Sequence, residues 1–220
     1  MDIRQIEAHL SDSKSKQQLK AIAQLREFEA EVAVPLLLSV RQDADFLVRS
    51  FVAMGLGKQL TADSFSALLE MVKFDRDSNV RAEAANSLSM FGRVSASHLV
   101  QVFIQDENWL VRRSILGALA DLNASEELFE VCLSGVVGDD ETVRESSIDG
   151  FGLLAQTSYQ AAALKQLLSR VDDPRVRVRM RVALALRAFD VEEAHLALSR
   201  LREDDDHRVV GAALEGSVAN

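Results

Sequence analysis

Apolar residues recur along this chain at the spacing of amphipathic helices. In four successive segments the core positions lie four residues apart, at Val48, Val52 and Leu56, at Val80, Ala84 and Leu88, at Val111, Ile115 and Leu119, and at Val143, Ser147 and Phe151. This spacing keeps one face of a helix turned inward. Before these segments, and further along the chain, shorter apolar stretches occupy residues 34–40, 65–72, 98–104, 128–136, 161–168 and 194–201. The pattern predicts pairs of helices and no strand.

A short motif, Asp/Asn-x-x-Val-Arg, opens the second helix of most pairs. It is intact at residues 45–49, 77–81, 108–112, 140–144 and 173–177, with steps of 32, 31, 32 and 33 residues. A further copy at 206–210 carries Val in place of Arg, and a degenerate copy opens the chain near Ser13. Asp, Asn and Ser side chains accept hydrogen bonds from the free amides of a helix's first turn, so each motif predicts a helix start. Pro174, directly after Asp173, suits the first helical position.

The repeat predicts an all-α protein. Seven helical hairpins of this length, stacked side by side, make an α-solenoid (superhelix) in which each unit buries its apolar stripe against its neighbours. No linker interrupts the pattern, so we expect a single repeat domain over residues 1–220, with degenerate terminal repeats near 1–28 and 191–220.

The composition of the chain argues against several kinds of partner, site and location. The chain has 25 Lys and Arg against 34 Asp and Glu, a net charge of −9, which argues against nucleic acid as a partner. A single cysteine, Cys132, excludes an internal disulfide and a Cys-based zinc site, and it fits a reducing compartment. No apolar run reaches the roughly 18 residues of a membrane span. We therefore expect a cytoplasmic protein with no membrane insertion.

The five intact motif copies, from Asp45/Arg49 to Asp173/Arg177, resemble the HEAT-like repeats of the phycobilisome-lyase family over essentially the whole chain. The small members of that family are bilin lyase subunits or act in phycobilisome degradation. The resemblance implies a binding protein whose partner is a phycobiliprotein or a homologous HEAT-like subunit. It implies no resident cofactor, and the ligand that it suggests is a transiently bound bilin. An enzymatic role would be that of a bilin lyase-type subunit acting with a partner. The alternative is a general scaffold or adaptor whose partner is unrelated to light harvesting.

The recurring capping residues and arginines predict a structural ladder. An arginine four residues after a capping side chain can pair with that cap or with the equivalent acid of the next repeat. A row of anion-binding sites is the alternative. The residues of the expected ladder are Asp45, Arg49, Asp77, Arg81, Asn108, Arg112, Asp140, Arg144, Asp173 and Arg177.

Arginines are concentrated in the sixth repeat. Arg175 and Arg179 lie four residues apart, and Arg181 aligns by motif with apolar residues of the other repeats, namely Ala53, Ala85, Leu116 and Ile148. Such a patch can clamp carboxylates, either the propionates of a bilin or an acidic protein surface. The alternative is a solvated face neutralised by nearby acids, Asp172, Asp173, Glu192 and Glu193.

Two large aromatic residues stand at the first position of second helices. Phe46 and Trp109 occur where other repeats have mostly polar residues, and Arg113 lies one turn after Trp109. Aromatic residues and arginines are frequent anchors of protein interfaces, so these three are partner-binding candidates. The alternative is that both rings pack against the preceding turn.

The sequence offers no catalytic or metal-binding group. The histidines, His9, His98, His195 and His207, lie on different repeats without carboxylate or thiol spacing to complete a metal site. Cys132 falls in an apolar helix without a neighbouring base, which is the pattern of a buried structural thiol.

Overall fold

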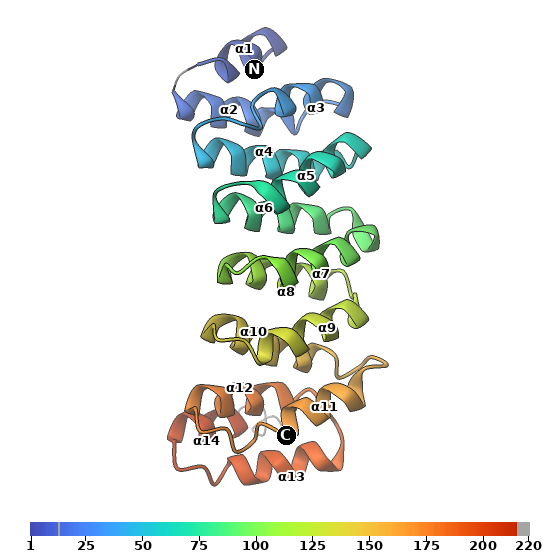
Figure 1. Cartoon of the computed structure of the whole chain (residues 1–220), viewed down its shortest axis with the longest axis vertical. Helices are drawn as coiled ribbons and strands as arrows, with labels where there is room; N and C mark the ends of the chain where they lie inside the picture. The colour runs from blue at the N-terminus through green and yellow to red at the C-terminus, as the bar shows by residue number, and fades with distance from the viewer. Residues whose placement is uncertain (13, 215–220) are drawn as a thin grey trace. The chain divides into compact units, whose positions relative to one another are not determined.

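The computed structural model describes residues 1–12 and 14–214, and these residues fold into helices joined by turns and short loops (Figure 1). Fourteen α-helices form seven hairpins, and no strand occurs in the described residues. The predicted all-α solenoid of two-helix repeats is confirmed. Ser13, near which the first motif copy was predicted, lies outside the described residues.

The helices group into two compact units, residues 1–122 and 123–220, where the sequence analysis expected one domain. Unit 1 contains four hairpins: α1 (Ile3–Leu10) and α2 (Ser15–Leu25), α3 (Ala30–Ser39) and α4 (Phe46–Gln59), α5 (Ala62–Phe74) and α6 (Ser78–Ser89), and α7 (Ala96–Gln105) and α8 (Trp109–Asp121). A 3-10 turn, η1 (Gly92–Ser95), precedes α7. Unit 2 contains three hairpins: α9 (Ser125–Val136) and α10 (Glu141–Leu153), α11 (Gln160–Leu168) and α12 (Val176–Leu186), and α13 (Glu192–Leu201) and α14 (His207–Leu214).

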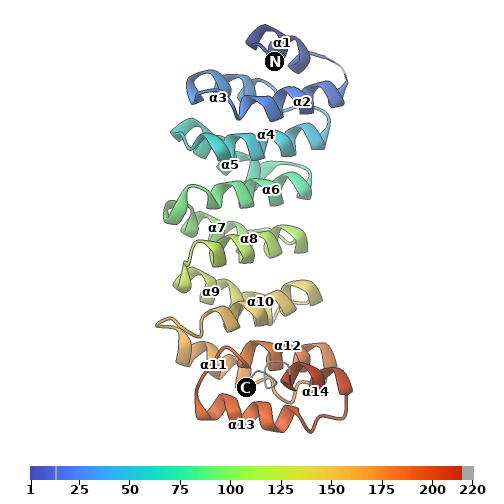
Figure 2. The same cartoon turned by 180° about the vertical axis from the view of Figure 1, so that it is seen from behind.

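The second helices of successive hairpins pack directly on one another. In unit 1, α2 contacts α4, α4 contacts α6 and α6 contacts α8; in unit 2, α10 contacts α12 and α12 contacts α14. The first helices touch each other less, so each unit is held chiefly through its row of second helices. Within each unit, the loops from first to second helices lie along one edge, visible from both sides (Figures 1 and 2).

Gly57 permits one of these close helix contacts. It lies on α4, and a Cβ atom there would be 2.8 Å from the Cβ and 3.1 Å from the Cα of Ser87 on α6. A glycine is therefore required for the two backbones to approach this closely.

The predicted core positions are buried. Val48, Val52 and Leu56 are fully enclosed, as are the equivalent residues on α6, α8 and α10. On α12, the buried triplet is Val178, Val182 and Leu186.

The predicted start of the second helix in the sixth repeat is wrong by two residues. Helix α12 begins at Val176 after Arg175, which makes no side-chain capping bond. Consequently Asp173 does not cap this helix, and Pro174 is not its first residue. The physical reason is a longer repeat: Arg175 follows the cap Asp140 by 35 residues, whereas the caps from Asp45 to Asp140 are 31 or 32 residues apart.

None of the described helices combines the length and the apolar character needed to span a bilayer.

Candidate functional site

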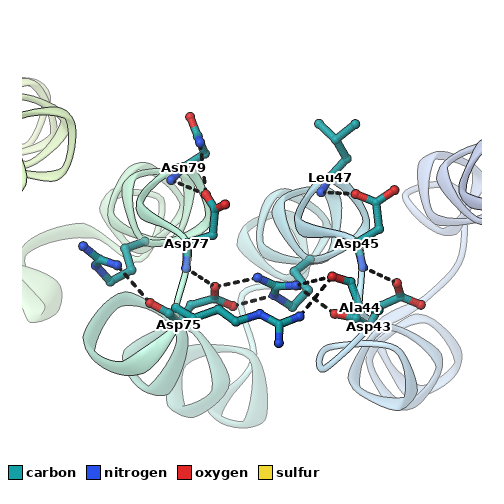
Figure 3. Close-up of polar contacts among 10 residues, drawn as sticks. Asp43, Ala44, Asp45, Leu47, Asp75, Asp77 and Asn79 are labelled. Atoms are coloured by element: carbon teal, nitrogen blue, oxygen red, sulfur yellow. Dashed lines mark hydrogen bonds and ion pairs between the residues drawn. The ribbon is translucent and has the colours of Figure 1, made fainter.

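The loops between first and second helices contain a repeated polar network (Figure 3). The Asp43 carboxylate accepts a hydrogen bond from the Asp45 N–H at 2.8 Å, and the Asp45 carboxylate accepts one from the Leu47 N–H at 2.9 Å. Arg49 donates to the Asp43 carbonyl at 2.8 Å. Asp75, Asp77, Asn79 and Arg81 repeat this arrangement one hairpin later. The first aspartate thus fixes the loop, and the second caps the helix.

Arginine connects each such loop to the next repeat. The Arg49 guanidinium donates to both carboxylate oxygens of Asp75, at 2.8 and 2.9 Å, and the two side chains are only 5% and 8% exposed (Figure 3). Arg81 binds Asp106 in the same bidentate manner at 2.6 and 3.2 Å. In unit 2, Arg179 binds Asp204 at 2.6 and 2.9 Å. We call these three pairs the arginine–aspartate ladder.

The first repeat has an uncharged version of this contact. Gln18 donates to the Asp43 carboxylate at 2.8 Å and to the Leu10 carbonyl at 3.2 Å. The donor-to-acid spacing is 25 or 26 residues in all four contacts, which shows that Gln18 occupies the arginine position.

The acids of the ladder differ from those expected. The acceptor is the first aspartate of the next loop, and the capping residue keeps to its own helix: Asp45, Asp77, Asn108 and Asp140 each accept from a backbone N–H of the first turn. Arg177 does not hold the ladder position, which belongs to Arg179. It pairs instead with Glu141 at 3.3 Å and Glu145 at 3.0 Å.

Two arginines brace only their own loops. Arg112 donates to the Asp106 carbonyl at 2.6 Å, and its guanidinium lies 5.5 Å from the centre of the Phe103 ring. Arg144 donates to the Gly138 carbonyl at 2.7 Å. Neither forms an ion pair in the described residues. The shared function of this arginine is therefore to hold its own loop. The residue in place of the ladder acid is Gly138 for Arg112, and for Arg144 it is Asp173, which binds Arg175 instead.

The arginines of the sixth repeat are neutralised within the chain. Arg175 binds Asp173 at 2.7 Å, Arg179 binds Asp204, and Arg181 lies 3.4 Å from Glu145 and 3.3 Å from Asp149. With the corrected helix start, Arg181 aligns with Phe51, Glu83, Ser114 and Ser146, so its expected apolar counterparts were wrong. Most of the neutralising acids lie on α10 and in the loop between α13 and α14. These arginines are therefore already paired, and they do not form a free cationic site for the carboxylates of a ligand.

Exposed apolar side chains stand along the loop edge of unit 1. Phe46 and Trp109, at the first positions of α4 and α8, are 38% and 43% exposed. Phe74 and Ile104, in the last turns of α5 and α7, are 79% and 56% exposed. We call these four residues the apolar edge. Arg113, on α8, is also exposed.

Two open hollows lie beside the apolar edge. One, of about 340 Å³, is lined by Arg41, Glu70 and Phe74 among others. The second, of about 600 Å³, is lined by residues including Lys73, Arg81 and Gln105, and Asp75 borders both hollows. The smaller hollow has a mainly apolar lining that includes Phe74 of the apolar edge, and the larger hollow has a mainly polar lining.

Acid should weaken the ladder in unit 2. The Arg179 guanidinium beside Asp204 lowers the pKa of that carboxyl, so the pair adds stability above the ordinary aspartate pKa and loses it as the pH falls through the lowered value. We expect Asp204→Asn to lower the melting temperature at pH 7 and to flatten its fall below about pH 4. Thermal melts from pH 7 to pH 2 test this; parallel curves for the two proteins would contradict it.

The structure brings no metal site together in the described residues. No three His, Cys, Asp or Glu side chains there are placed to hold an ion. Cys132 is fully buried, and burial raises the pKa of its thiol. Its Sγ lies so close to Gly150 that a Cβ at that position would clash with it.

Comparisons with known proteins agree with the repeat architecture. The family model for HEAT repeats matches residues 3–89 and, in an overlapping register, 34–120. No curated protein matches the sequence. The crystal structure of YibA from Escherichia coli is similar with a TM-score of 0.66 and 16% identity, over 96% of this chain and 80% of that one. The complex of CpcE and CpcF of phycocyanin lyase from Nostoc sp. PCC7120 has a TM-score of 0.55 and 18% identity, over 97% and 94%.

Proposed function

Since the chain belongs to the HEAT-repeat family, we propose that it is a protein-binding scaffold that uses the apolar edge of unit 1. Solenoids present extended surfaces, and stacked hairpins position side chains on them at regular intervals. The observation that carries the proposal is the exposure of Phe46, Phe74, Ile104 and Trp109 along one edge. Exposed aromatic and aliphatic groups gathered in this way mark interaction sites, and aromatic residues frequently dominate binding energy.

For the partner, we propose a phycobiliprotein. The motif copies at residues 45–49, 77–81, 108–112 and 140–144 support this, because they resemble repeats of the phycobilisome-lyase family. The similarity to the phycocyanin lyase complex extends over nearly the full length of both chains, which is compatible with the same reading. A bilin bound transiently, through its partner protein, is part of this proposal. Attachment or removal of the chromophore would make the chain a bilin lyase-type subunit acting with a partner.

The alternative is an adaptor whose partner is unrelated to light harvesting. The same fold occurs in YibA, so the repeat architecture by itself suits either partner. The two possibilities differ in whether phycobiliproteins bind and whether binding alters the bilin.

Mixing the purified chain with phycocyanin and with allophycocyanin tests the proposal. We expect co-elution in size-exclusion chromatography; a shifted or diminished bilin absorbance would indicate action on the chromophore, and an unchanged spectrum would indicate a scaffold. No association with either protein would refute the phycobiliprotein partner and leave the general adaptor.

Variants of the apolar edge locate the binding surface. Replacing both Phe74 and Trp109 by serine should weaken the complex at least about tenfold, because truncating an aromatic anchor often costs 2 kcal/mol or more. The melting temperature should change little, since both side chains are exposed. Leu196→Ser is the matched control, because Leu196 is 64% exposed but lies on α13 of unit 2. Equal weakening by the control would exclude the apolar edge as the site.

A further inference from the structure

Helix α4, a second helix of unit 1, presents an outward face with an apolar strip. On α4, Leu47 and Met54 are each 44% exposed, and Phe51 between them is partly exposed. These residues are four and three positions apart, so they share one side of the helix. Leu47 projects away from the polar loop network (Figure 3). We call this surface, with Ser50 of α4 and Glu83 of α6, the second-helix face.

Glu83 is a partly buried carboxylate without a partner. It forms no hydrogen bond or ion pair within the described residues, and burial alone raises the pKa of its carboxyl group. A carboxylate that loses water without gaining a donor is unfavourable in its charged form. The surroundings of Glu83 therefore disfavour the charged form of its carboxyl group.

The equivalent position in unit 2 shows what is missing. Arg181 stands six residues after the N-cap of α12, as Glu83 does after the N-cap of α6. Arg181 is satisfied by Glu145 and Asp149 of the preceding second helix, α10. The residues at those two positions on α4 are Ser50 and Met54. On the preceding helix, Glu83 thus has a hydroxyl and a thioether at the two positions where Arg181 has oppositely charged side chains.

Ser50, at the position of α4 that corresponds to Glu145, has a second unsatisfied group. Its Oγ atom is buried and forms no hydrogen bond in the described residues. Buried polar groups in folded proteins are nearly always hydrogen-bonded, so an orphaned hydroxyl calls for an explanation. The Ser50 Oγ atom is closed to solvent, so the group that an incoming lysine or arginine can reach is the partly exposed carboxylate of Glu83.

We propose that the second-helix face binds a helical segment of a protein partner, which places a lysine or arginine against Glu83 and apolar side chains against Leu47, Phe51 and Met54. Helices commonly dock by laying an apolar stripe into a surface of this kind. The net charge of −9 also favours a basic partner segment. The inference rests on the proposed role as a protein-binding scaffold, and it does not require that the partner be a phycobiliprotein.

A selection experiment tests the chemistry of the occupant. A displayed library of single-helix peptides, randomised on one face, is selected against the intact chain, and the recovered peptides are titrated by fluorescence anisotropy. We expect them to share a lysine or arginine flanked by apolar residues three or four positions away. Glu83→Gln should weaken their binding at least tenfold. Glu130→Gln, on the exposed surface of first helix α9, should leave it unchanged.

Stability provides the second measurement. Because burial disfavours the charged carboxylate, Glu83→Gln should keep or raise the melting temperature at pH 7 while it weakens binding. A structural role for Glu83 would instead lower the melting temperature. The proposal is overturned if no peptide is recovered, if the recovered peptides lack a cation, or if they bind Glu83→Gln as tightly as the original chain. Peptides whose binding depends on Phe74 rather than Glu83 also overturn it.

The two proposals fail separately. A chain that binds a basic helical peptide through Glu83 but binds neither phycocyanin nor allophycocyanin contradicts the phycobiliprotein partner and supports the second-helix face. If the chain selects no basic peptide, and if its Glu83→Gln variant binds a phycobiliprotein with full affinity, the phycobiliprotein partner is supported and the second-helix face is contradicted.

Discussion

Replacing Arg49 by alanine should lower the free energy of unfolding by about 3–5 kcal/mol, the usual cost of breaking a buried ion pair. The loss arises mainly from Asp75, whose carboxylate is 8% exposed and would keep its charge without the guanidinium. The loop carbonyls of Asp43 and Ala44 would lose their donor as well. Denaturant unfolding followed by circular dichroism gives the free energy directly.

A paired substitution separates the ion pair from the rest of the contact. Combining Arg49→Met with Asp75→Asn removes both charges and keeps an oxygen that can accept the Asp77 N–H. Replacing a buried pair by uncharged groups is often close to neutral, so the double variant should recover much of the stability lost with Arg49→Ala. A double variant as unstable as Arg49→Ala would mean that bracing the loop, and not pairing the charge, is the main contribution.

Substituting Gly57 and Gly117 by alanine should shift stability in opposite directions. At Gly57 the new Cβ would meet the Cβ and Cα of Ser87, and a backbone atom cannot rotate away. We expect a net loss of about 1–2 kcal/mol from forcing α4 and α6 apart. At Gly117, in the middle of α8, a Cβ meets nothing within 4 Å. There the higher helix propensity of alanine should stabilise by about 0.5–1 kcal/mol.

Thermal and denaturant melts of the two variants make a matched comparison, since both introduce the same methyl group in a second helix of unit 1. Similar changes for both would show that helix propensity, and not the α4–α6 approach, determines the response at Gly57.

The helical hairpins could be predicted because local rules determine them. Apolar residues at four-residue intervals, and Asp or Asn before them, describe a helix and its start without reference to the rest of the chain. The caps Asp45, Asp77, Asn108 and Asp140 behave accordingly. In the sixth repeat, the same rule selected Asp173 because it precedes a Val-Arg pair. The burial of Val178, Val182 and Leu186 shows that the following Val-Arg pair, 178–179, is the equivalent one.

The ladder acids carried a sequence signal that the motif omitted. An aspartate recurs two residues before the cap in four repeats, at Asp43, Asp75, Asp106 and Asp204. A motif begun two residues earlier would have included the acceptor of the cross-repeat ion pair. It would also have placed Asp173 correctly, because that residue accepts from the Arg175 N–H just as Asp43 accepts from Asp45.

The candidate site was harder to predict, because neutralisation depends on neighbours in space. Asp173, one of the nearby acids expected to neutralise the patch, does bind Arg175, but Arg181 reaches Glu145, which lies 36 residues earlier in the chain and is not found by counting neighbours in the sequence. Phe46 and Trp109 were identified by their helix position, whereas Phe74 and Ile104 were overlooked, since an apolar residue at the end of a first helix looks like core. Glu83 belongs to no motif, and its environment appears only when α4 and α6 pack together.

The burial of Cys132 against Gly150 makes its thiol a built-in probe of local unfolding. The thiol is the only one in the sequence, it is fully buried, and alkylating reagents react with exposed thiolates. Labelling at this position therefore has to wait until the α9–α10 hairpin separates, and the rate of labelling reports how often this hairpin opens under native conditions. The rate at which this hairpin opens can thus be measured in the unaltered protein, without an engineered probe.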